Sequence, residues 1–310
     1  MNYYTVGIDV GGTNIKLGLV NRSGKIIVRA FLETKKYHRQ KSQLINALVR
    51  EIQLLVQSKN LIKKNIAGIG IGLPGIIDPQ KGIVGFLPNV PGWRNVPLRR
   101  ILQSKLGIPV FIDNDVNLVT LAEWKFGAGQ GVGNLICLTL GTGVGSGLIL
   151  DNSLYRGEGF AAGELGHLPL NEQGPRCPCG GWGCFERYVG NGDLMKKAAK
   201  KFRQKNITLP DVYRLASRGN QDALRFWREA GEHVGNALVS VVNLLNPRLI
   251  IIGGGVSNNF RFMEKTVNAV IKRRAMKFQA GMVKIVRAKL GDDAGIIGAH
   301  VLAKEATSGF

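Results

Sequence analysis

At 310 residues the chain is longer than a typical single domain, and this length predicts two domains. Hydrophobic residues make up 45% of the chain, with 42 glycines and only 11 prolines, and this composition fits a compact α/β protein. No uninterrupted apolar run approaches the roughly 20 residues that span a bilayer, and the first residues, MNYYTVGIDV, begin a strand without a basic-then-apolar leader, so we expect a cytoplasmic protein with no membrane partner.

The formal net charge is +21, from 42 Lys+Arg against 21 Asp+Glu. Such an excess makes nucleic acid or a membrane surface a partner to consider. The basic residues are nevertheless spread along the chain, as on the polar faces of amphipathic helices, and do not form one arm or patch. We therefore interpret them as a solvated basic surface, with weak polyanion affinity as the alternative, and expect no specific nucleic-acid partner.

Two stretches have the pattern of a β-hairpin with a tip rich in glycine and threonine. They are VGIDVGGTNIKLGLV (residues 6–20) and ICLTLGTGVGSGLIL (residues 136–150). Side by side the two need no gap, and Gly18 then falls one position from Gly147. The residues that leave each tip are strand-like, whereas a Walker loop or a Rossmann turn would open a helix.

The rest of the chain alternates predicted helices and strands. Apolar residues at helical spacing predict helices over residues 40–58, 97–106, 116–126, 229–245, 260–275 and 294–304. Short apolar runs predict strands over residues 66–73, 109–112, 249–252 and 283–288. We expect a loop over residues 82–93 and an irregular segment over residues 151–184.

The two tips are candidate phosphate sites. Glycines let backbone N–H groups converge on an anion, and threonine hydroxyls add further donors. The alternative is that the glycines merely permit two tight turns. Two such tips, with Asp9 just before the first, favour two related domains that grip one polyphosphate.

A cysteine cluster indicates a metal site. Three of the four cysteines form Cys177-Pro-Cys179-Gly-Gly-Trp-Gly-Cys184, and His167 lies a short loop upstream. Because a cytosolic chain does not keep disulfides, clustered cysteines there more often bind metal. Three thiolates and one imidazole make a closed tetrahedral set, which is typical of structural zinc. The alternative is a loop of reduced structural cysteines, and Cys137, inside a predicted strand, is expected to pack in the core.

Three carboxylates are candidates for the reaction. Asp115 follows a strand end in FIDND, where parallel α/β sheets collect functional groups, and a carboxylate there can take the proton of an attacking hydroxyl. Its alternative role is the N-cap of the following helix, which Asp113 or Asn114 can also supply. Glu164 and Glu186 flank the cysteine loop and suit a polyol, although helix-cap or salt-bridge roles remain open.

Together these motifs resemble the ROK family of bacterial sugar kinases, and within it the glucokinases. The resemblance covers essentially the whole chain, and its most specific part is AGELGH followed by C-x-C-G-x-x-G-C-x-E. The matching motifs are DVGGT (Asp9–Thr13), GLPG (Gly72–Gly75), PNVPGW (Pro88–Trp93), DNDVN (Asp113–Asn117), LGTGVGSG (Leu140–Gly147), AGELGH (Ala162–His167), CPCGGWGCFE (Cys177–Glu186) and GGGVS (Gly253–Ser257).

The resemblance implies the actin-like, ribonuclease H-like ATPase fold, with two related α/β domains and a cleft between them. It predicts a small domain of residues 1–113 plus 294–310 and a large domain of residues 114–293 that carries the zinc loop. It also implies that Asp115 is the general base that activates the 6-hydroxyl of the sugar, with Mg-ATP as the phosphoryl donor.

The resemblance assigns the remaining site residues as well. The ATP and phosphate set is Asp9, Gly11, Gly12, Thr13, Lys16, Gly141, Thr142, Gly143, Gly253, Gly254 and Gly255. The sugar-binding set is Gly75, Asn89, Asn114, Asp115, Glu164, His167 and Glu186. One structural zinc, held by His167, Cys177, Cys179 and Cys184, would keep the sugar-binding residues of the zinc loop in register, with one His167 nitrogen on the metal and the other facing a hydroxyl.

The expected function is therefore a glucokinase of carbohydrate metabolism and glycolysis. Val90 and the RYVGN stretch after Glu186 depart from the family pattern near the sugar and leave other substrates open: N-acetylmannosamine, N-acetylglucosamine, fructose or allose. Inorganic polyphosphate is an alternative donor. The family also contains sugar-binding transcriptional repressors, but only eight residues precede Asp9, too few for a DNA-binding domain. By resemblance we expect a homo-oligomer, a dimer or a tetramer.

Overall fold

The structure is a computed structural model that describes residues 4–37, 41–87 and 92–307. By their internal contacts, the residues form two compact units. The first unit comprises Met1–Gly131, Leu154–Ala162 and Lys289–Phe310, and the second comprises Val132–Ser153 and Gly163–Ala288.

This division differs from the domain boundary expected just before helix α3 (Asp115–Phe126). Helix α3 belongs to the first unit because its buried face packs on the C-terminal helix α10 (Ala294–Thr307). Leu118 and Leu121 of α3 form one buried cluster with Ala299 of α10. The boundary therefore follows the packing of α3, which hydrophobic periodicity alone does not assign to a neighbour.

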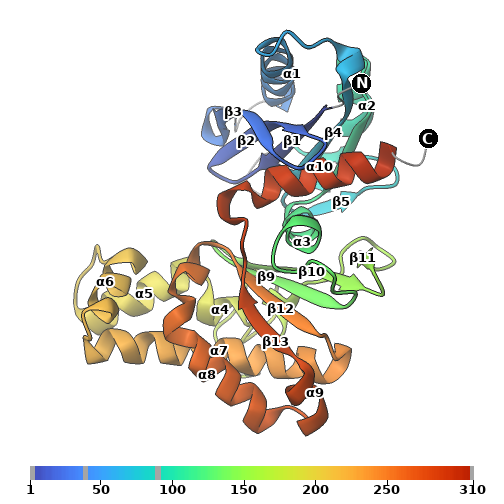
Figure 1. The fold of residues 1–310 in the computed structure, drawn as a ribbon. Coiled ribbons are helices and arrows are strands. Elements are labelled where there is room, and N and C mark those ends of the chain that lie inside the picture. Colours follow the sequence, from blue (N-terminus) through green and yellow to red (C-terminus); the bar gives the residue numbers. More distant parts are fainter. Residues whose placement is uncertain (1–3, 38–40, 88–91, 308–310) are drawn as a thin grey trace. The chain divides into compact units, whose positions relative to one another are not determined.

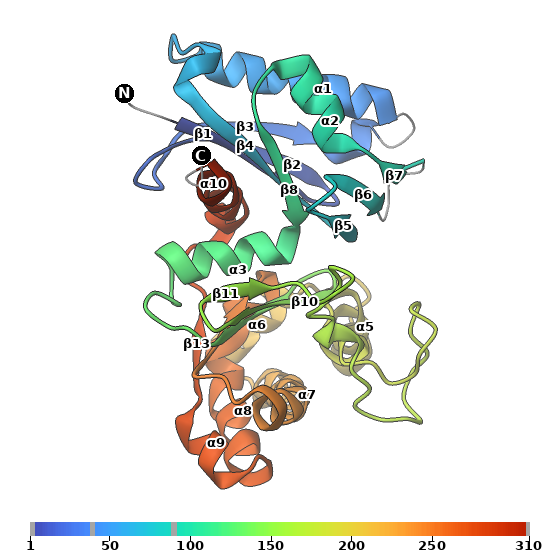
Figure 2. The same cartoon turned by 90° about the vertical axis from the view of Figure 1, so that its right-hand side faces the viewer.

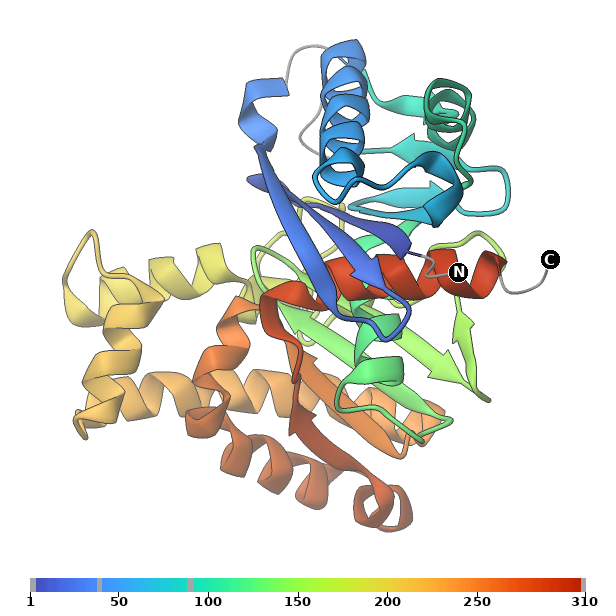
Figure 3. The ribbon, with the colours of Figure 1, turned by 45° about the horizontal axis from the view of Figure 1, so that its top comes forward.

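The first unit is built on a five-stranded sheet in the order β3-β2-β1-β4-β8 (Figure 1). Its strands are β1 (Tyr4–Val10), β2 (Asn14–Asn21), β3 (Ile26–Glu33), β4 (Ile66–Leu73) and β8 (Val110–Asn114). The first three form an antiparallel meander, visible as the blue strands of Figure 3, and β1, β4 and β8 run parallel. The parallel part brings the carboxyl ends of β1, β4 and β8 to one edge of the sheet.

A second, three-stranded antiparallel sheet consists of β5 (Ile76–Asp78), β6 (Ile83–Phe86) and β7 (Arg94–Val96). The expectation of a loop over residues 82–93 is therefore wrong for β6. The sequence signal is weak there because each strand has only three or four residues, and a glycine interrupts β6.

Helices cover both faces of the main sheet of the first unit. Figure 2 shows α1 (Lys41–Gln57) and α2 (Leu98–Leu106) on one face and α10 on the other. Helix α10 lies so close to the strands that a Cβ atom on Gly7 or Gly70 would clash with a backbone carbonyl oxygen of α10. The glycines of these strands therefore make room for the helix. No helix among residues 4–37, 41–87 and 92–307 is long and apolar enough to cross a membrane.

The strands of the second unit belong to a five-stranded sheet in the order β11-β10-β9-β12-β13. Its strands are β9 (Leu135–Leu140), β10 (Val144–Leu150), β12 (Leu249–Gly253) and β13 (Lys284–Arg287), and β11 (Ser153–Tyr155) follows β10 along the chain. Its helices are α4 (Glu186–Val189), α5 (Asn191–Phe202), α6 (Leu209–Ser217), α7 (Gln221–Leu245), α8 (Phe260–Arg274) and α9 (Lys277–Met282).

Helix α7 starts eight residues earlier than residue 229, where the sequence predicted its start. Asn220 caps it: the Asn220 side chain accepts the backbone N–H of Ala223 at 3.0 Å. Phe226 and Trp227, in the part that was not predicted, are buried in the core that α7 shares with α8 and the sheet. Charged residues alternate with the apolar ones at this end of the helix and interrupt the apolar stripe.

The two predicted hairpins form, but their tips differ by one residue. The last pair of the β1–β2 ladder joins Val10 to Ile15, which leaves residues 11–14 as the tip. The last pair of β9–β10 joins Leu140 to Val144, which leaves residues 141–143. The comparison without a gap is therefore wrong past the tip. With this correction Gly18 and Gly147 occupy the same step of their ladders, because Gly7 pairs with Gly18 and Cys137 with Gly147.

Candidate active site and metal centre

The segment from β8 to α3 assigns a different role to each residue of Asp113-Asn114-Asp115. Asn114 is the N-cap of α3, because its backbone is extended and its Oδ1 accepts the backbone N–H groups of Val116 at 2.9 Å and Asn117 at 3.3 Å. Its Nδ2 donates to the carbonyl oxygen of Gly75 at 3.2 Å. Two predicted sugar-binding residues are thus in contact, whereas a third, Asn89, lies outside the described residues.

Asp113 is a buried structural carboxylate. Only 1% of the residue is exposed, and its Oδ2 accepts from Arg156 Nε at 2.8 Å and Nη2 at 2.6 Å. Its Oδ1 accepts from Asn117 Nδ2 at 2.9 Å. Asp115 is the first residue of α3 and is half-buried, and its Oδ1 accepts the N–H of Val116 at 2.9 Å. The capping role left open for Asp115 therefore falls mainly on Asn114.

The first glycine-threonine tip is held by Thr34, a residue that the sequence analysis missed. The backbone N–H of Thr34 donates to Thr13 O at 2.9 Å, and its hydroxyl donates to Gly11 O at 2.7 Å. The tip is closed by Gly11 N–H donating to Asn14 O at 3.0 Å. Gly12 and Thr13 are exposed, so their polar groups can meet a ligand.

Two charged residues flank this tip. Asp9 is the last residue but one of β1, and burial raises its pKa above the ordinary value, with the charge of Lys16 opposing the shift and that of Asp292 adding to it. Lys16 Nζ lies 3.6 Å from the Asp292 carboxylate and donates to its backbone carbonyl at 3.2 Å. Lys16 is thus held beside the tip by the loop that precedes α10.

The second tip lies in a cavity of about 770 Å³ within the second unit. Three predicted phosphate residues line it: Gly141, Thr142 and Gly255. The other lining residues were not predicted, and they are Asn191, Leu209, Pro210, Tyr213, Val256, Asn258, Asn259 and Arg287. Gly253 instead ends β12, and Gly254 follows it with a positive φ of 80°, where a Cβ would clash with Leu140. The cavity combines backbone donors with an apolar and aromatic wall.

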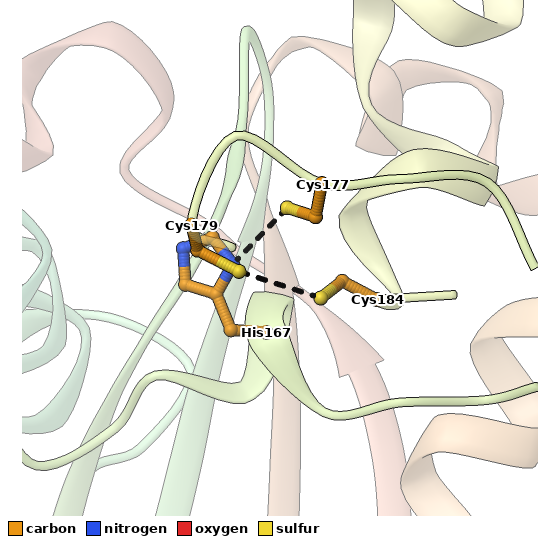
Figure 4. Close-up of side chains that lie close together, drawn as sticks. All are labelled: His167, Cys177, Cys179 and Cys184. Atoms are coloured by element: carbon orange, nitrogen blue, oxygen red, sulfur yellow. Dashed lines mark hydrogen bonds between the residues drawn. The ribbon is translucent and has the colours of Figure 1, made fainter. Parts of the chain in front are cut away.

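His167, Cys177, Cys179 and Cys184 come together as predicted, with their ligand atoms all within 4.8 Å of one another (Figure 4). Cys177 Sγ lies 3.7 Å from His167 Nδ1, and Cys179 Sγ lies 3.7 Å from Cys184 Sγ. Burial raises the pKa of the Cys184 thiol to about 12, while the backbone N–H of Gly181 lowers the pKa of Cys179. Four soft or borderline donors converging on one point form a set that can hold a metal ion.

Glu164 and Glu186 differ in their surroundings. The side chain of Glu164 is 63% exposed, and its Oε2 lies 4.0 Å from Nε2 of His167, the ring nitrogen that faces away from Cys177. Glu186 begins α4, and its Oε2 accepts the backbone N–H of Val144 at 2.8 Å. Glu164 is thus open to a ligand next to the metal set, whereas Glu186 is bonded to the second tip.

Cys137 lies in β9 and is fully buried, outside the metal set. This placement fits the expected core-packing role.

The chain belongs to the ROK family, whose sequence profile matches residues 5–306. The fold is accordingly that of the ROK kinases, the actin-like ATPase fold built from two related α/β domains. In this fold the doubled hairpin begins each half, which accounts for the repeat in the sequence.

Several known proteins are similar to this chain. A xylose repressor from Caldicellulosiruptor bescii is 34% identical over 305 residues, which are 94% of this chain and 76% of the repressor. A glucokinase from Thermotoga maritima is 31% identical over 319 residues, 98% of each chain. A ROK family glucokinase from Streptomyces griseus, solved in complex with glucose and AMPPNP, is 29% identical with a TM-score of 0.80 and covers 97% of this chain and 99% of its own.

Proposed function

We propose that this chain is an ATP-dependent glucokinase that phosphorylates the 6-hydroxyl of glucose, with Asp115 as the general base. The observation that carries the proposal is the division of roles within Asp113-Asn114-Asp115. Asp113 is engaged by Arg156 and Asn117, and Asn114 caps α3. Asp115 lies half-buried directly after β8, at the carboxyl end of a parallel strand, and this position suits its carboxylate to meet a substrate.

For this reaction the protein has two main tasks, to place a base and to neutralise charge. The Asp115 carboxylate accepts the proton of the sugar hydroxyl as the hydroxyl oxygen bonds to the γ-phosphorus and the bond to ADP breaks. A base must be ionised, and the first turn of a helix favours a negative charge because the helix dipole is positive there. Bound Mg²⁺ would neutralise the phosphate oxygens, and we assign Asp9 and Thr13 of the first tip, with Thr142 of the second, to Mg-ATP.

We assign the cavity of the second unit to the nucleotide. A volume of about 770 Å³ lies within the range of about 300–1,000 Å³ that is usual for small-molecule sites. The tip at Gly141 and Thr142 offers backbone and hydroxyl donors to phosphates, while Tyr213 and Val256 offer an aromatic and an apolar surface to the base. The first tip would bind phosphate through Gly11, Gly12, Thr13 and Lys16.

The metal that best fits the Cys₃His set is zinc. Tetrahedral zinc with bonds of about 2.3 Å to sulfur and 2.0–2.1 Å to nitrogen sets neighbouring ligands roughly 3.6–3.8 Å apart. The His167–Cys177 and Cys179–Cys184 distances, both 3.7 Å, match this spacing. Because all four positions are filled by protein donors, the zinc would have a structural role.

For the sugar we assign Gly75, Asn114, Asp115, Glu164, His167 and Glu186. His167 would bind the metal through Nδ1 and present Nε2, near Glu164, to a hydroxyl. Asn89 completes the proposed set. None of these contacts selects glucose over an N-acetylated hexose, fructose or allose, so a kinase for one of those sugars is the second candidate.

A sugar-sensing repressor is the third candidate, favoured by the similarity to the Caldicellulosiruptor bescii repressor and by the net charge of +21. A sensor must bind sugar but needs no general base. The carboxylate of Asp115 therefore favours the kinase over the sensor. Turnover separates the two classes of protein, and a gel-shift assay at physiological salt tests DNA binding directly.

The deciding experiment is a coupled ADP-release assay with Mg-ATP against glucose, mannose, fructose, N-acetylglucosamine, N-acetylmannosamine and allose. We expect the highest kcat/KM for glucose. A preference for another sugar would keep the mechanism and change the substrate. If no sugar gives turnover while calorimetry detects sugar binding, the kinase proposal is wrong and a sensor replaces it.

A further inference from the structure

Both ends of the metal loop converge on Val144, the first residue of β10 after the second tip. On one side the Glu186 carboxylate, two residues after Cys184, accepts the Val144 N–H at 2.8 Å. On the other side Gly166, next to His167, packs so closely on the Val144 carbonyl that a Cβ on this glycine would clash with it. Val144 is therefore contacted by the segment next to His167 and by the segment after Cys184.

The segment after Cys184 holds the start of the tip as well. The backbone N–H of Asn191 donates to Gly141 O at 2.9 Å. A Cβ on Gly143 would lie 2.5 Å from Glu186 Oε2, so only glycine lets the carboxylate approach. Residues 186–191 thus bind the tip at its first residue, Gly141, and at Val144, where the tip ends.

The metal loop is itself tied down beside the cysteines. Phe185 N–H donates to Leu168 O at 2.8 Å, and Leu170 N–H donates to Gly183 O at 2.8 Å. These bonds join the strand-like segments that follow His167 and precede Glu186. A metal ion held by His167 and Cys184 would therefore fix the spacing of the two segments that grip Val144.

We propose that Glu186 is a positioning residue for the phosphate-binding tip, and that the Cys₃His metal centre thereby sets the affinity of the chain for a nucleotide polyphosphate. The inference rests on the proposed function in one respect, namely that the second tip binds phosphate. In this proposal Glu186 has a role in nucleotide binding in addition to the sugar contact assigned above. The first tip is held within its own unit by Thr34.

The test uses the metal-loaded protein and measures two quantities besides turnover. Calorimetry gives the Kd for ADP, and hydrogen exchange with mass spectrometry gives the protection of residues 141–144. In Glu186→Ala we expect faster exchange at Val144 and a Kd for ADP raised about tenfold, because one hydrogen bond to a charged group is lost. Glu186→Gln keeps an oxygen acceptor and should stay within about threefold of wild type.

Glu172→Ala is the matched control, because Glu172 is an exposed carboxylate of the same loop. It should change neither quantity. Gly143→Ala perturbs the contact from the tip side and should reproduce Glu186→Ala if that variant does not fold. The metal is removed by a chelator, and elemental analysis verifies its loss. In the metal-free protein we expect a faster hydrogen exchange at Val144 and a higher Kd for ADP, whereas residues 11–14 should keep their wild-type exchange rates.

The outcomes separate this inference from the proposed function. If wild type binds ADP and the alanine variant or the metal-free protein binds it equally well, the inference is wrong and the proposed function stands. If wild type does not bind ADP at all, both are wrong. If Glu186→Ala binds sugar more weakly but binds ADP with unchanged affinity, the inference is also wrong.

Discussion

The Arg156 guanidinium donates to Asp113 through Nε at 2.8 Å and Nη2 at 2.6 Å, from a position 43 residues away in the sequence. Asp115, only two residues from Asp113, lies half-buried at the first position of α3. A buried carboxylate with its own cation stabilises the fold, because removing either partner leaves a buried charge without compensation. We therefore expect mutation of Asp113 to lower the stability of the fold and mutation of Asp115 to lower turnover.

Asp115→Asn should abolish most turnover without unfolding the protein. Loss of a general base typically lowers kcat by about 10²–10⁴-fold, while sugar affinity should change by no more than a few-fold because the amide keeps the size of the side chain. Steady-state kinetics and sugar calorimetry measure the two effects. Asp222→Asn, which also removes a carboxylate from the first turn of a helix, should leave kcat unchanged. A fully active Asp115→Asn enzyme would refute the assignment of the base.

Asp113→Asn should mainly lower stability. The change leaves the Arg156 guanidinium facing a neutral amide. Breaking a fully buried pair costs about 3–5 kcal/mol, and we expect the lower end of this range because the Arg156 side chain is 27% exposed. Urea unfolding followed by circular dichroism measures the change in the free energy of unfolding. A double variant with Arg156→Met should be less destabilised than the sum of the single variants, because the charge is then removed with its partner. Strict additivity would contradict the ion-pair account.

Removal of the metal set should destabilise the second unit. We expect one zinc per chain by elemental analysis and its loss in Cys184→Ala, with a lower melting temperature, because metal binding free energy adds to folding free energy. Cys137→Ala is the control: Cys137 is fully buried in β9, so its variant should lose some stability but keep its zinc. Equal zinc content in both variants would contradict the Cys₃His assignment.

Stability should fall at acid pH because of His300, a residue on α10 that the sequence analysis did not single out. It is 1% exposed, its Nδ1 lies 2.7 Å from Thr5 Oγ1, and burial, with a smaller effect of Lys304, lowers its pKa to about 4. The unfolded chain protonates near pH 6.5 but the folded chain resists, so stability is lost as pH falls from about 6.5 toward 4. At pH 5 the loss is about 2 kcal/mol.

His300→Asn isolates this contribution. Its free energy of unfolding, measured in urea at pH 7.5 and pH 5, should decrease less than that of wild type. His233, whose pKa burial also lowers to about 4, remains in both proteins and cancels in the comparison. An identical pH dependence for both proteins would show that His300 does not titrate as inferred.

Gly70→Ala should test the close approach of α10 to the sheet. A Cβ at this position would clash with the backbone carbonyl of Ala299, and backbone atoms of a packed helix cannot move aside without cost. We expect a loss of at least about 2 kcal/mol, in the range of overpacked cores. Gly192→Ala, in an exposed helical position with open space around it, should be neutral or slightly stabilising. Thermal unfolding of the two variants gives the comparison.

Much of the fold was predictable because its elements carry strong local patterns. The two hairpins, the glycine-rich strand β4 and the helices α1, α8 and α10 follow from spacing alone. The cysteine loop was predictable for a different reason: the chemistry of three thiols and an imidazole restricts what they can do. The extra residue of the first tip was already visible as the one-position offset of Gly18 from Gly147.

The remaining features depend on contacts that no local pattern encodes. Arg156 belongs to an irregular segment, so nothing in its neighbourhood points to Asp113. Asn191 holds the second tip through its backbone N–H, a group that nearly every residue has, and Thr34 holds the first tip through its backbone N–H and its hydroxyl. Their signal, a polar residue at the end of a strand or the start of a helix, recurs too often in the chain to identify them.

The position of α10 also constrains the order in which the protein can form. Helix α10 covers the sheet of the first unit, but its residues 294–307 are the last of the described chain to leave the ribosome, after the whole of the second unit. The sheet of the first unit, complete at Asn114, must therefore wait with an uncovered apolar face until α10 begins at Ala294, about 180 residues later, at about 5–20 residues per second. During those seconds the nascent first unit is a natural client for a chaperone.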